Sequence, residues 1–378
     1  MQPLRDVVLA PLTTFRLGGR ARYFVEVQSD DEVLEAWRWA NDAHVSELLV
    51  LGGGSNLLIA DPGTQGLVLR TGQRGIDFEE RADEVWVTAR AGELWDDLVR
   101  QSVERGLAGL ECMSGIPGCV GATPVQNVGA YGQEVAQTLL RVELFDRTDG
   151  QRLTFGNGDC ALGYRDSRFK SREANRYIVL SVTFRLTRNP PEPLRNRELL
   201  AELTARGVGV PRVSDVRDAV MTVRARKSML ADPSDPLARS AGSFFVNPIV
   251  SRPTANELRA RCPGLEVPHW DLPDGRVKLA AAWLIEQAGF ARGDRFGRAG
   301  LSPHHCLVIV AHARASSAEV VSMARRIRTT VKDRFGIDLY PEPNFWGFDG
   351  YEGDGLPLID DEGPRTLDSA ACPAPASR

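Results

Sequence analysis

The pattern of apolar and polar residues near the N-terminus predicts a strand, a helix and two more strands in close succession. Residues 23–27 are rich in aromatic and β-branched side chains, and residues 48–51 and 57–59 are short apolar runs. Ser29 and Glu32 have the spacing of a capping box, which marks a helix start. The apolar face of that helix comprises Val33, Leu34, Trp37 and Ala40. We therefore expect a β-α-β subdomain over residues 1–65.

A second region, residues 66–213, combines strands with one amphipathic helix. Apolar runs predict strands at 85–87, 139–145 and 177–186. The helix is expected over 93–105, ended by Gly106. Residues 189–193 contain three prolines and are expected to form a loop that leaves this region.

A third region, residues 214–347, is expected to mix helices and strands. Helical periodicity predicts helices over 214–227, 277–288 and 316–335, and apolar runs predict strands over 307–311 and 337–340. Ser316 and Glu319 give the last helix a capping box, and Gly336 ends it. The chain is therefore predicted to belong to the α+β class.

The C-terminal residues differ in composition from the rest. Residues 348–378 hold seven acidic residues, two arginines and no periodic apolar pattern, so we expect an acidic, disordered tail. The net charge is −4, which leaves the body near neutral and without the basic excess that nucleic-acid binding requires. No apolar run approaches the length of a membrane span, and the first residues do not resemble a secretory signal. We expect a cytoplasmic protein with no nucleic-acid or membrane partner.

The spacing of cysteine and histidine argues against disulfides and metal sites. The six cysteines are scattered and form no C-x-x-C pair, so free buried thiols are expected. The five histidines show no zinc-binding spacing, and no metal is expected. His304 and His305 are interpreted as structural.

Two glycine-rich segments are candidates for ligand binding. Residues 52–56 (Gly-Gly-Gly-Ser-Asn) follow an apolar strand and form either a phosphate nest or a tight β-turn. Residues 114–132 mix glycine with apolar side chains, which suits a buried backbone track along a large ligand. In that track Gln126 and Asn127 offer amide groups. Neither segment contains G-x-G-x-x-G, and the chain has no Gly-Lys pair, which argues against Rossmann and Walker A sites.

Several polar residues are candidates for chemistry, each with an ordinary structural alternative. Arg165 can hold a carboxylate with both arms of its guanidinium, or can pair with a neighbouring acid at the surface. Ser243 lies between glycine and two phenylalanines, outside any nucleophile-elbow pattern, and is otherwise a turn serine. Glu342 lies between two prolines and is either a directed carboxylate or a solvent-facing one. Arg224 and Lys227 share a helix face and can contact phosphates or complement the helix dipole.

Six motifs then follow one another in a characteristic order. They are residues 14–19 (Thr-Phe-Arg-Leu-Gly-Gly), 51–58 (Leu-Gly-Gly-Gly-Ser-Asn-Leu-Leu), 116–121 with 126–132, 164–167 (Tyr-Arg-Asp-Ser), 242–245 with 247–248, and 341–343 (Pro-Glu-Pro). This set resembles the UDP-N-acetylenolpyruvoylglucosamine reductase family, the MurB flavoenzymes of peptidoglycan synthesis, over residues 10–347.

The resemblance implies a fold, a cofactor and a reaction. The implied fold is a two-subdomain FAD-binding module of the vanillyl-alcohol-oxidase (PCMH) type followed by a C-terminal α+β substrate-binding domain. The implied reaction uses FAD and NADPH to reduce UDP-N-acetylglucosamine enolpyruvate to UDP-N-acetylmuramate. The implied FAD contacts are Gly52, Gly53, Gly54, Ser55, Asn56, Gly115, Ile116, Gly118, Gly121, Ala122, Thr123, Gln126, Asn127, Gly129 and Tyr131. The implied substrate contacts are Tyr164, Arg224, Lys227 and Asn247.

The resemblance also implies three catalytic residues. Arg165 and Glu342 would stabilise the negative charge that forms when hydride reaches the enolpyruvyl group, and Ser243 would protonate the α-carbon. Glu342 would act either as a protonated acid or by fixing Arg165. The subclass resembled by residues 126–129 carries a tyrosine in a loop over the substrate. The corresponding stretch here, residues 193–199, holds Asn196, and the sequence leaves open whether Asn196 replaces that tyrosine.

Three other classes of function share some of these features. A sugar oxidase on the same fold would keep the glycine-rich segments without needing Ser243 and Glu342, and would consume oxygen. A regulator that binds UDP-sugars would lack tightly bound flavin. An acyl-transfer enzyme built on Cys119 would need a histidine nearby. We expect a monomeric reductase.

Overall fold

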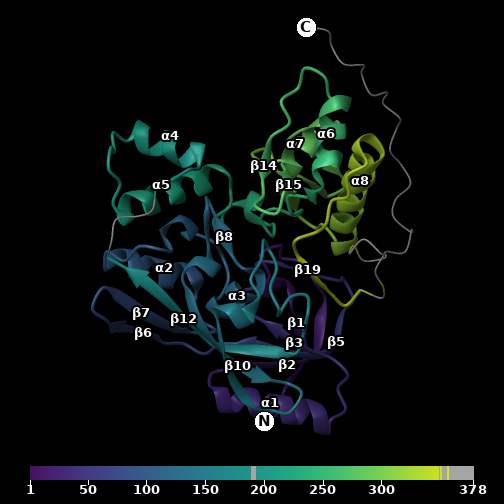
Figure 1. Ribbon diagram of the computed structural model, residues 1–378. Coiled ribbons are helices and arrows are strands. Elements are labelled where there is room, and N and C mark those ends of the chain that lie inside the picture. The colour runs from purple at the N-terminus through teal and green to yellow at the C-terminus, as the bar shows by residue number, and fades with distance from the viewer. Residues whose placement is uncertain (189–192, 349, 351–355, 357–378) are drawn as a thin grey trace.

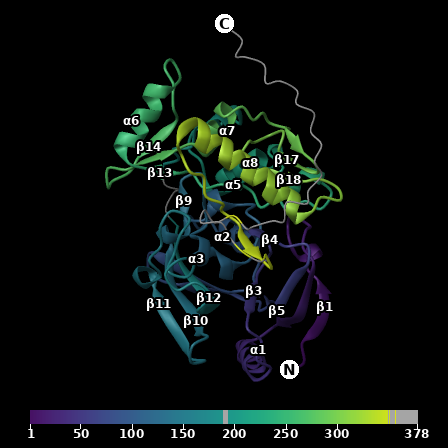
Figure 2. The ribbon, with the colours of Figure 1, turned by 90° about the vertical axis from the view of Figure 1, so that its right-hand side faces the viewer.

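The computed structural model describes residues 1–188, 193–348, 350 and 356. Two sheets lie side by side in the lower half of Figure 1, and a mixed region of helices and short strands lies above them. Figure 2, turned by 90°, shows the same division, with the C-terminal helices above the N-terminal sheets.

The first sheet has the strand order β1-β2-β5-β3 and is flanked by helix α1 (Asp30–Asp42). Its strands are β1 (Leu4–Val8), β2 (Arg20–Val27), β3 (Leu48–Leu51) and β5 (Gly63–Thr71). The predicted strands and helix are confirmed, and the Ser29 side chain accepts a hydrogen bond from the Glu32 amide at 3.2 Å. Strand β5 was not predicted, because its first four residues are Gly-Thr-Gln-Gly and hide the apolar run that follows. It pairs in parallel with both β2 and β3, and the expected boundary after residue 65 falls inside it.

The second sheet is antiparallel, in the order β11-β10-β12-β7-β6. Its strands are β6 (Ile76–Glu80), β7 (Glu84–Arg90), β10 (Leu139–Asp146), β11 (Arg152–Gly156) and β12 (Tyr177–Thr187). The three predicted strands are confirmed, and β6 and β11 were missed. Helix α2 (Trp95–Glu104) covers the sheet with Trp95, Leu98 and Val99, all fully buried. Gly106 follows it with φ +70°, as a helix-ending glycine should.

Short elements join this sheet to the rest of the chain. They are α3 (Thr123–Gln126), the strand pair β8 (Gly129–Ala130) and β9 (Gln133–Glu134), and 3-10 turns at Ala10–Leu12, Glu111–Met113, Val120–Ala122, Val135–Gln137, Asn157–Cys160 and Pro236–Ala238. Helices α4 (Arg197–Ala205) and α5 (Val213–Arg226) follow and pack on each other. Helix α5 confirms the prediction for 214–227.

The C-terminal region holds helices α6 (Arg252–Arg261), α7 (Ala281–Gln287) and α8 (Ser317–Phe335). Two three-stranded sheets accompany them, in the orders β13-β15-β14 and β16-β17-β18. Their strands are β13 (Ile249–Val250), β14 (His269–Asp271), β15 (Val277–Leu279), β16 (Arg295–Phe296), β17 (Ala299–Leu301) and β18 (Ile309–Ala311). Helix α8 has the predicted capping box at Ser316 and Glu319, and Gly336 ends it at φ +71°.

Two predicted elements are wrong. The expected helix over 277–288 begins only at Ala281, because Val277 and Leu279 alternate inward as the middle strand of a sheet. The expected strand over 337–340 does not form, although the Tyr340 carbonyl accepts a hydrogen bond from the Val246 amide at 3.0 Å, next to an isolated bridge between Phe245 and Pro341. Ile337 and Leu339 alternate inward because they pack on the C-terminal core, and that spacing imitates a strand.

The chain instead returns to its beginning a few residues later. Strand β19 (Asn344–Trp346) pairs in parallel with β4 (Leu57–Ile59), which directly follows the first glycine-rich segment. The main C-terminal core accordingly includes Phe15, Leu17 and Leu58 from the N-terminal region. This pairing links the last strand of the described residues to the N-terminal region.

The prediction that nothing beyond residue 347 packs on the body is wrong at two residues. Phe348 lies edge-on to Phe345 with ring centroids 5.9 Å apart, and Leu356 is fully buried in the C-terminal core. The rest of the expected tail, residues 349, 351–355 and 357–378, lies outside the described residues except for Gly350, as does most of the expected loop at 189–193.

The five cysteines within the described residues are free and buried, as predicted, while Cys372 lies outside them. None of the helices in the described part of the chain is both long enough and apolar enough to cross a bilayer.

Candidate active site

A cavity of about 510 Å³ lies where the two glycine-rich segments meet the C-terminal region. Of the residues singled out in the sequence, those that line it are Ser55, Asn56, Ile116, Gly118, Ala122, Thr123, Gln126, Gly129, Tyr131, Arg165, Arg224, Lys227, Ser243 and Glu342. Residues that are far apart in the sequence therefore share one wall. The three expected catalytic residues all belong to it.

The two glycine-rich segments touch through their backbones. A Cβ on Gly53 would lie 2.6 Å from the Cα of Gly118, and a Cβ on Gly54 would lie 2.1 Å from the carbonyl oxygen of Leu12. The Ser55 hydroxyl donates a hydrogen bond to the carbonyl of Pro117 at 2.9 Å and so holds the two segments together. Glycine at these positions is therefore a requirement of close packing, in addition to any ligand.

The first glycine-rich segment also exposes backbone donors. Among the residues that the structure describes, none of the amides of residues 52–56 donates a hydrogen bond. A run of free amides in a tight turn is an anion-binding nest.

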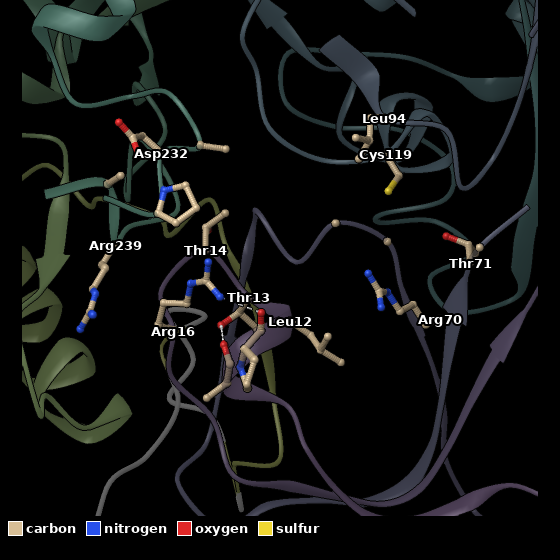
Figure 3. Close-up of a pocket in the computed structure, with 18 of the residues that line it drawn as sticks. Leu12, Thr13, Thr14, Arg16, Arg70, Thr71, Leu94, Cys119, Asp232 and Arg239 are labelled. Atoms are coloured by element: carbon tan, nitrogen blue, oxygen red, sulfur yellow. Dashed lines mark hydrogen bonds between the residues drawn. The ribbon is translucent and has the colours of Figure 1, made fainter. Parts of the chain in front are cut away.

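A second cleft of about 680 Å³ begins at Gly52 and Gly53 and shares Thr14 and Cys119 with the first cavity. Arg16, Arg70 and Arg239 surround it, as Figure 3 shows. Free amides beside several guanidinium groups suit a diphosphate.

Arg165 and Glu342 form an ion pair inside the first cavity. Arg165 Nε lies 3.1 Å from Glu342 Oε1, and both side chains are largely buried. Arg165 Nη2 donates to the carbonyl of Gly129 at 2.6 Å, which fixes the guanidinium against the second glycine-rich segment. The amide of Glu342 donates to the carbonyl of Phe244 at 2.8 Å, so the acid is held beside the serine motif.

Ser243 presents a free hydroxyl to the same cavity. Its neighbours Phe244 and Phe245 have exposed fractions of 0% and 1% and hold the segment in the C-terminal core. Gly242 precedes it with φ +72°, a left-handed conformation that favours glycine. In the described part of the chain the Ser243 hydroxyl has no hydrogen-bond partner, whereas the earlier alternative of a turn serine would give it one.

A cationic corner lies at the far side of the cavity. Arg224 donates Nη2–H to the carbonyl of Met229 at 2.7 Å, while its buried Nε has no partner in the described residues. Burial lowers the pKa of Arg224, although an arginine stays charged. Lys227 is ion-paired with Glu198 of helix α4. An unpaired guanidinium N–H that is buried in a cavity wall points to an anionic ligand.

Asn196 has a structural task in helix α4. Its side-chain oxygen accepts hydrogen bonds from the amides of Glu198 and Leu199, both at 3.1 Å, and so caps the helix. It also lines the cavity, at the place where the resemblance led us to look for a tyrosine.

Eight of the singled-out residues do not line the first cavity. Gly52 and Gly53 line the second cleft, and the structure gives each of the other six another contact. Gly54 lies under Leu12, and a Cβ on Gly121 would lie 2.7 Å from that of Ala91. The amide of Gly115 donates to Asp96 Oδ1 at 2.6 Å. Asn127 (φ +43°) donates to the carbonyl of Gly163 at 2.7 Å, and Asn247 Oδ1 accepts from the amide of Ala281 at 2.9 Å, at the start of α7. Lys278 Nζ lies 4.5 Å from the ring centre of Tyr164.

Sequence reasoning missed three residues around the site. His305 lines the cavity, although it was interpreted as structural; its Nδ1 accepts from the Leu307 amide at 3.1 Å, so Nε2 carries the proton of the neutral ring. Burial lowers the pKa of His305 and keeps it neutral near pH 7. Lys170 and Lys278 lie behind the cavity wall. Only four of the 46 basic residues are lysine, and this scarcity is the sequence signal that could have drawn attention to Lys170 and Lys278.

The fold and this cavity define a class of protein. Residues 21–156 match the FAD-binding domain family model, and the structure has the two sheets, the glycine-rich cleft and the C-terminal domain of a PCMH-type flavoprotein. The protein is therefore an FAD-binding oxidoreductase of that type.

More specific comparisons identify the family. Residues 232–346 match the C-terminal domain of UDP-N-acetylenolpyruvoylglucosamine reductase. Enzymes with that name from Streptomyces coelicolor and Thermobifida fusca are 43% and 44% identical to the chain, cover 91% and 90% of it, and are themselves covered to 90% and 96%. The crystal structure of the Thermus caldophilus enzyme superposes with a TM-score of 0.62 at 26% identity and covers 92% of this chain and 100% of its own. The chain belongs to the UDP-N-acetylenolpyruvoylglucosamine reductase family.

Proposed function

We propose that this protein uses NADPH to reduce UDP-N-acetylglucosamine enolpyruvate to UDP-N-acetylmuramate, with Arg165, Ser243 and Glu342 as its catalytic residues. The observation that carries the proposal is that these three side chains line one cavity, next to both glycine-rich segments. The proposal includes a cytoplasmic monomer with a division near residue 213.

The residues fit FAD. The free amides of residues 52–56 and the arginines of the second cleft suit its diphosphate, while the track from Ile116 to Tyr131 lines the cavity where the flavin would lie. When bound, FAD supplies the hydride chemistry, taking hydride from NADPH and giving it to the substrate.

Arg165 would hold the substrate carboxylate as negative charge develops on it. Two of its N–H groups face the backbone carbonyls of Asn127 and Gly129, at 3.4 and 2.6 Å, which aims the guanidinium before substrate arrives. Such a preorganised donor contributes about 3–4 kcal/mol to the stability of a transition state.

Ser243 would protonate the α-carbon. A serine hydroxyl is a weak acid, but a carbanion-like α-carbon is a strong base, so the proton transfer is downhill. Its hydroxyl makes no hydrogen bond within the described residues and lines the cavity, which suits a group that must donate to a substrate. Phe244 and Phe245 hold the backbone still.

Arg224 and Lys227 would bind the diphosphate of the UDP group. Arg224, whose Nε is unpaired in the described residues, and Lys227 line the same cavity. Glu198 neutralises Lys227 in the structure, so substrate phosphate would compete with that carboxylate.

The alternatives account for fewer of these contacts. A sugar oxidase would have no use for the Arg165–Glu342 pair, and a regulator would not need a free serine hydroxyl. Burial raises the pKa of Cys119, which disfavours the thiolate that an acyl-transfer enzyme would require.

One experiment tests the proposal. The purified protein is mixed with NADPH and the enolpyruvyl substrate, and NADPH oxidation, oxygen uptake and product mass are followed together. We expect NADPH consumption matched by lactyl-ether product, with no stoichiometric oxygen uptake. Oxygen uptake without product would favour the oxidase, and a colourless, inactive protein would favour the regulator.

A further inference from the structure

Lys170 lies behind the cavity, in contact with two residues of its wall. Its Nζ donates to Gln126 Oε1 at 2.9 Å and to the carbonyl of Arg165 at 3.2 Å. Burial lowers its pKa, and the nearby Glu342 carboxylate partly offsets that effect. No surface role accounts for a lysine held in this way.

The ammonium determines which way the Gln126 amide points. An ammonium has three donors and no acceptor, so only the amide oxygen can face it. The amide nitrogen must therefore face the other way, and Gln126 Nε2 lies 3.1 Å from Glu342 Oε1. Without Lys170, contact with Glu342 alone would determine which end of the amide faces it.

This orientation makes the two oxygens of Glu342 unequal. Oε1 accepts a hydrogen bond from Gln126 Nε2 and lies 3.1 Å from Arg165 Nε, although that Nε–H makes no hydrogen bond within the described residues. Gln126 therefore occupies Oε1. No hydrogen bond within the described residues uses Oε2, which leaves that oxygen for the substrate.

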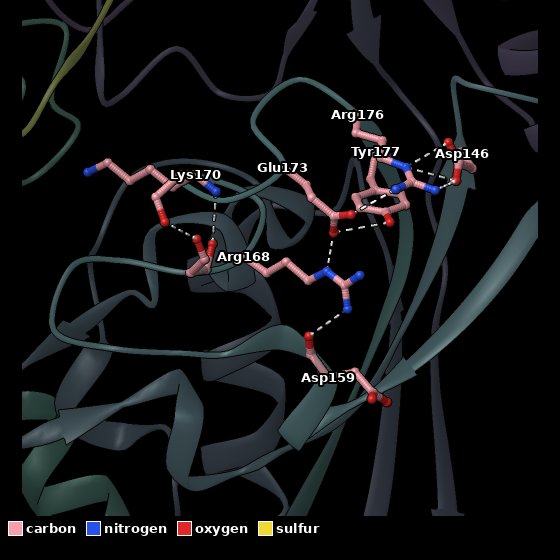
Figure 4. A network of polar contacts seen from close by, with 9 residues as sticks. Asp146, Asp159, Arg168, Lys170, Glu173, Arg176 and Tyr177 are labelled. Carbon is pink, nitrogen blue, oxygen red and sulfur yellow. Dashed lines mark hydrogen bonds and ion pairs between the residues drawn. The ribbon is translucent and has the colours of Figure 1, made fainter.

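Ion pairs hold the segment that carries Lys170. Arg168 pairs with Glu173, and Arg176 pairs with both Glu173 and Asp146, the last at 2.7 Å (Figure 4). The segment that contains Arg165 and Lys170 is thereby tied to the second sheet through β10. The backbone segment that carries Lys170 is therefore held in place by these ion pairs.

The choice of lysine is informative in this chain. Only four of its 46 basic residues are lysine, and three of the four, Lys170, Lys227 and Lys278, lie at or behind the cavity. A compact ammonium fits a single amide oxygen, whereas a guanidinium needs the space of a planar fork.

We propose that Lys170 is a positioning residue that orients the Gln126 amide and thereby directs its N–H to Glu342 Oε1, leaving Oε2 for the substrate. The inference rests on the proposed function, in which Glu342 is a catalytic residue.

The test compares four variants in single-turnover experiments. Lys170→Met removes the donor and the charge, Lys170→Gln keeps a donor without charge, and Gln126→Leu removes the intermediary. Lys332→Met, an ion-paired lysine at the end of α8, is the matched control. Flavin content and Tm are measured for each variant.

We expect Lys170→Met to slow flavin reoxidation by the enolpyruvyl substrate about 10- to 100-fold, the usual cost of a misplaced group, with KM little changed. Lys170→Gln should not recover that loss, because an amide can both donate and accept and so allows either orientation of Gln126. Flavin reduction by NADPH should keep its rate in both Lys170 variants and in the control.

The double variant Lys170→Met/Gln126→Leu tests whether Lys170 acts through Gln126. If Lys170 acts through Gln126, the double variant is no slower than Gln126→Leu alone. Additive losses would overturn the proposal, and so would a Lys170→Gln variant as fast as the wild type. If Lys170→Met does not fold, the comparison of Lys170→Gln with wild type still decides. An inactive wild type would count against the proposed function instead.

Discussion

The side-chain amide of Asn56 donates to the backbone carbonyl of Glu342 at 3.2 Å, across 286 positions of sequence. The amide of Asn344 returns a hydrogen bond to the carbonyl of Asn56 at 3.0 Å. The first glycine-rich segment and the acid of the candidate site are therefore one unit. Contacts that position the first glycine-rich segment therefore also position Glu342.

Asn56→Ala tests this link. The variant loses one neutral hydrogen bond, which stabilises a folded protein by about 1 kcal/mol. We expect a small fall in Tm together with weaker flavin retention and slower turnover. Denaturant unfolding, flavin release and kcat measure the three effects, and Gln28→Ala, at an exposed glutamine, is the control. A change in Tm alone would show that the link has no bearing on the site.

Ser243→Ala should separate the two halves of the reaction. The substitution removes one oxygen and leaves the packing of Phe244 and Phe245 intact. We expect near-normal flavin bleaching by NADPH and reoxidation by the substrate slowed at least ~10²-fold, as for a lost general acid. Stopped-flow absorbance resolves both halves. Equal slowing of both would indicate that Ser243 positions the cofactor instead.

Arg165→Lys should not behave as a conservative change. An ammonium cannot reach the carbonyl of Gly129, face Glu342 and hold a substrate carboxylate together. We expect kcat to fall by about 10²- to 10³-fold, the usual cost of losing such a donor, with flavin still bound. Steady-state kinetics with flavin quantification measure this. Turnover near the wild-type level would remove Arg165 from the mechanism.

Leu356→Ala should destabilise the protein, although Leu356 lies in the segment expected to be a tail. Its side chain is fully buried in the C-terminal core, and such truncations cost about 2–5 kcal/mol. Truncation after Gly347 should cost at least as much. Leu265→Ala, at a half-exposed leucine, should change stability by under about 0.5 kcal/mol. Urea unfolding compares the three, and equal midpoints for Leu356→Ala and wild type would contradict the packing.

The ion pairs behind Lys170 should make stability depend on acid pH. Hydrogen bonds from Arg176 hold the pKa of the Asp146 carboxyl below 3.8, its ordinary value. A lowered folded-state pKa contributes stability above the ordinary pKa, and the contribution disappears as pH falls through the lowered value.

Asp146→Asn should therefore lower Tm at pH 7, and the difference from wild type should shrink well below pH 3.8. Asp274→Asn, in an exposed pair with Arg276, should have little effect at either pH. Thermal unfolding as a function of pH checks both variants. A constant difference for Asp146→Asn at all pH values would exclude this linkage.

The sequence predicted the elements whose signals are local. The capping boxes of α1 and α8 and the apolar runs of β10 and β12 appear in the structure at nearly the expected residues. The same kinds of signal gave wrong predictions where one apolar spacing is compatible with two structures. Ile337 and Leu339 alternate as in a strand, but they do so because both pack into the core. Residues 277–279 were assigned to a helix, but they form a strand in which Lys278 pairs with Ile249.

The residues that line the cavity were largely anticipated by motifs, but the contacts among them were not. Nothing near Lys170 in the sequence points to Gln126, which is 44 positions away, because that contact depends on how the chain folds back. Leu356 was overlooked for a related reason. The short run Leu-Pro-Leu-Ile at 356–359 lies in an acidic, glycine-rich stretch and carries no periodic signal, yet Leu356 fills a place in the core.

The pairing of β19 with β4 has a consequence for how the protein is made. The first strand of that pair leaves the ribosome early, but Glu342, just before its partner, is synthesised 286 positions after Asn56. The N-terminal sheets can collapse during translation, yet the parallel pair beside the first glycine-rich segment must wait. The candidate active site can therefore be completed only after the C-terminal region has been synthesised.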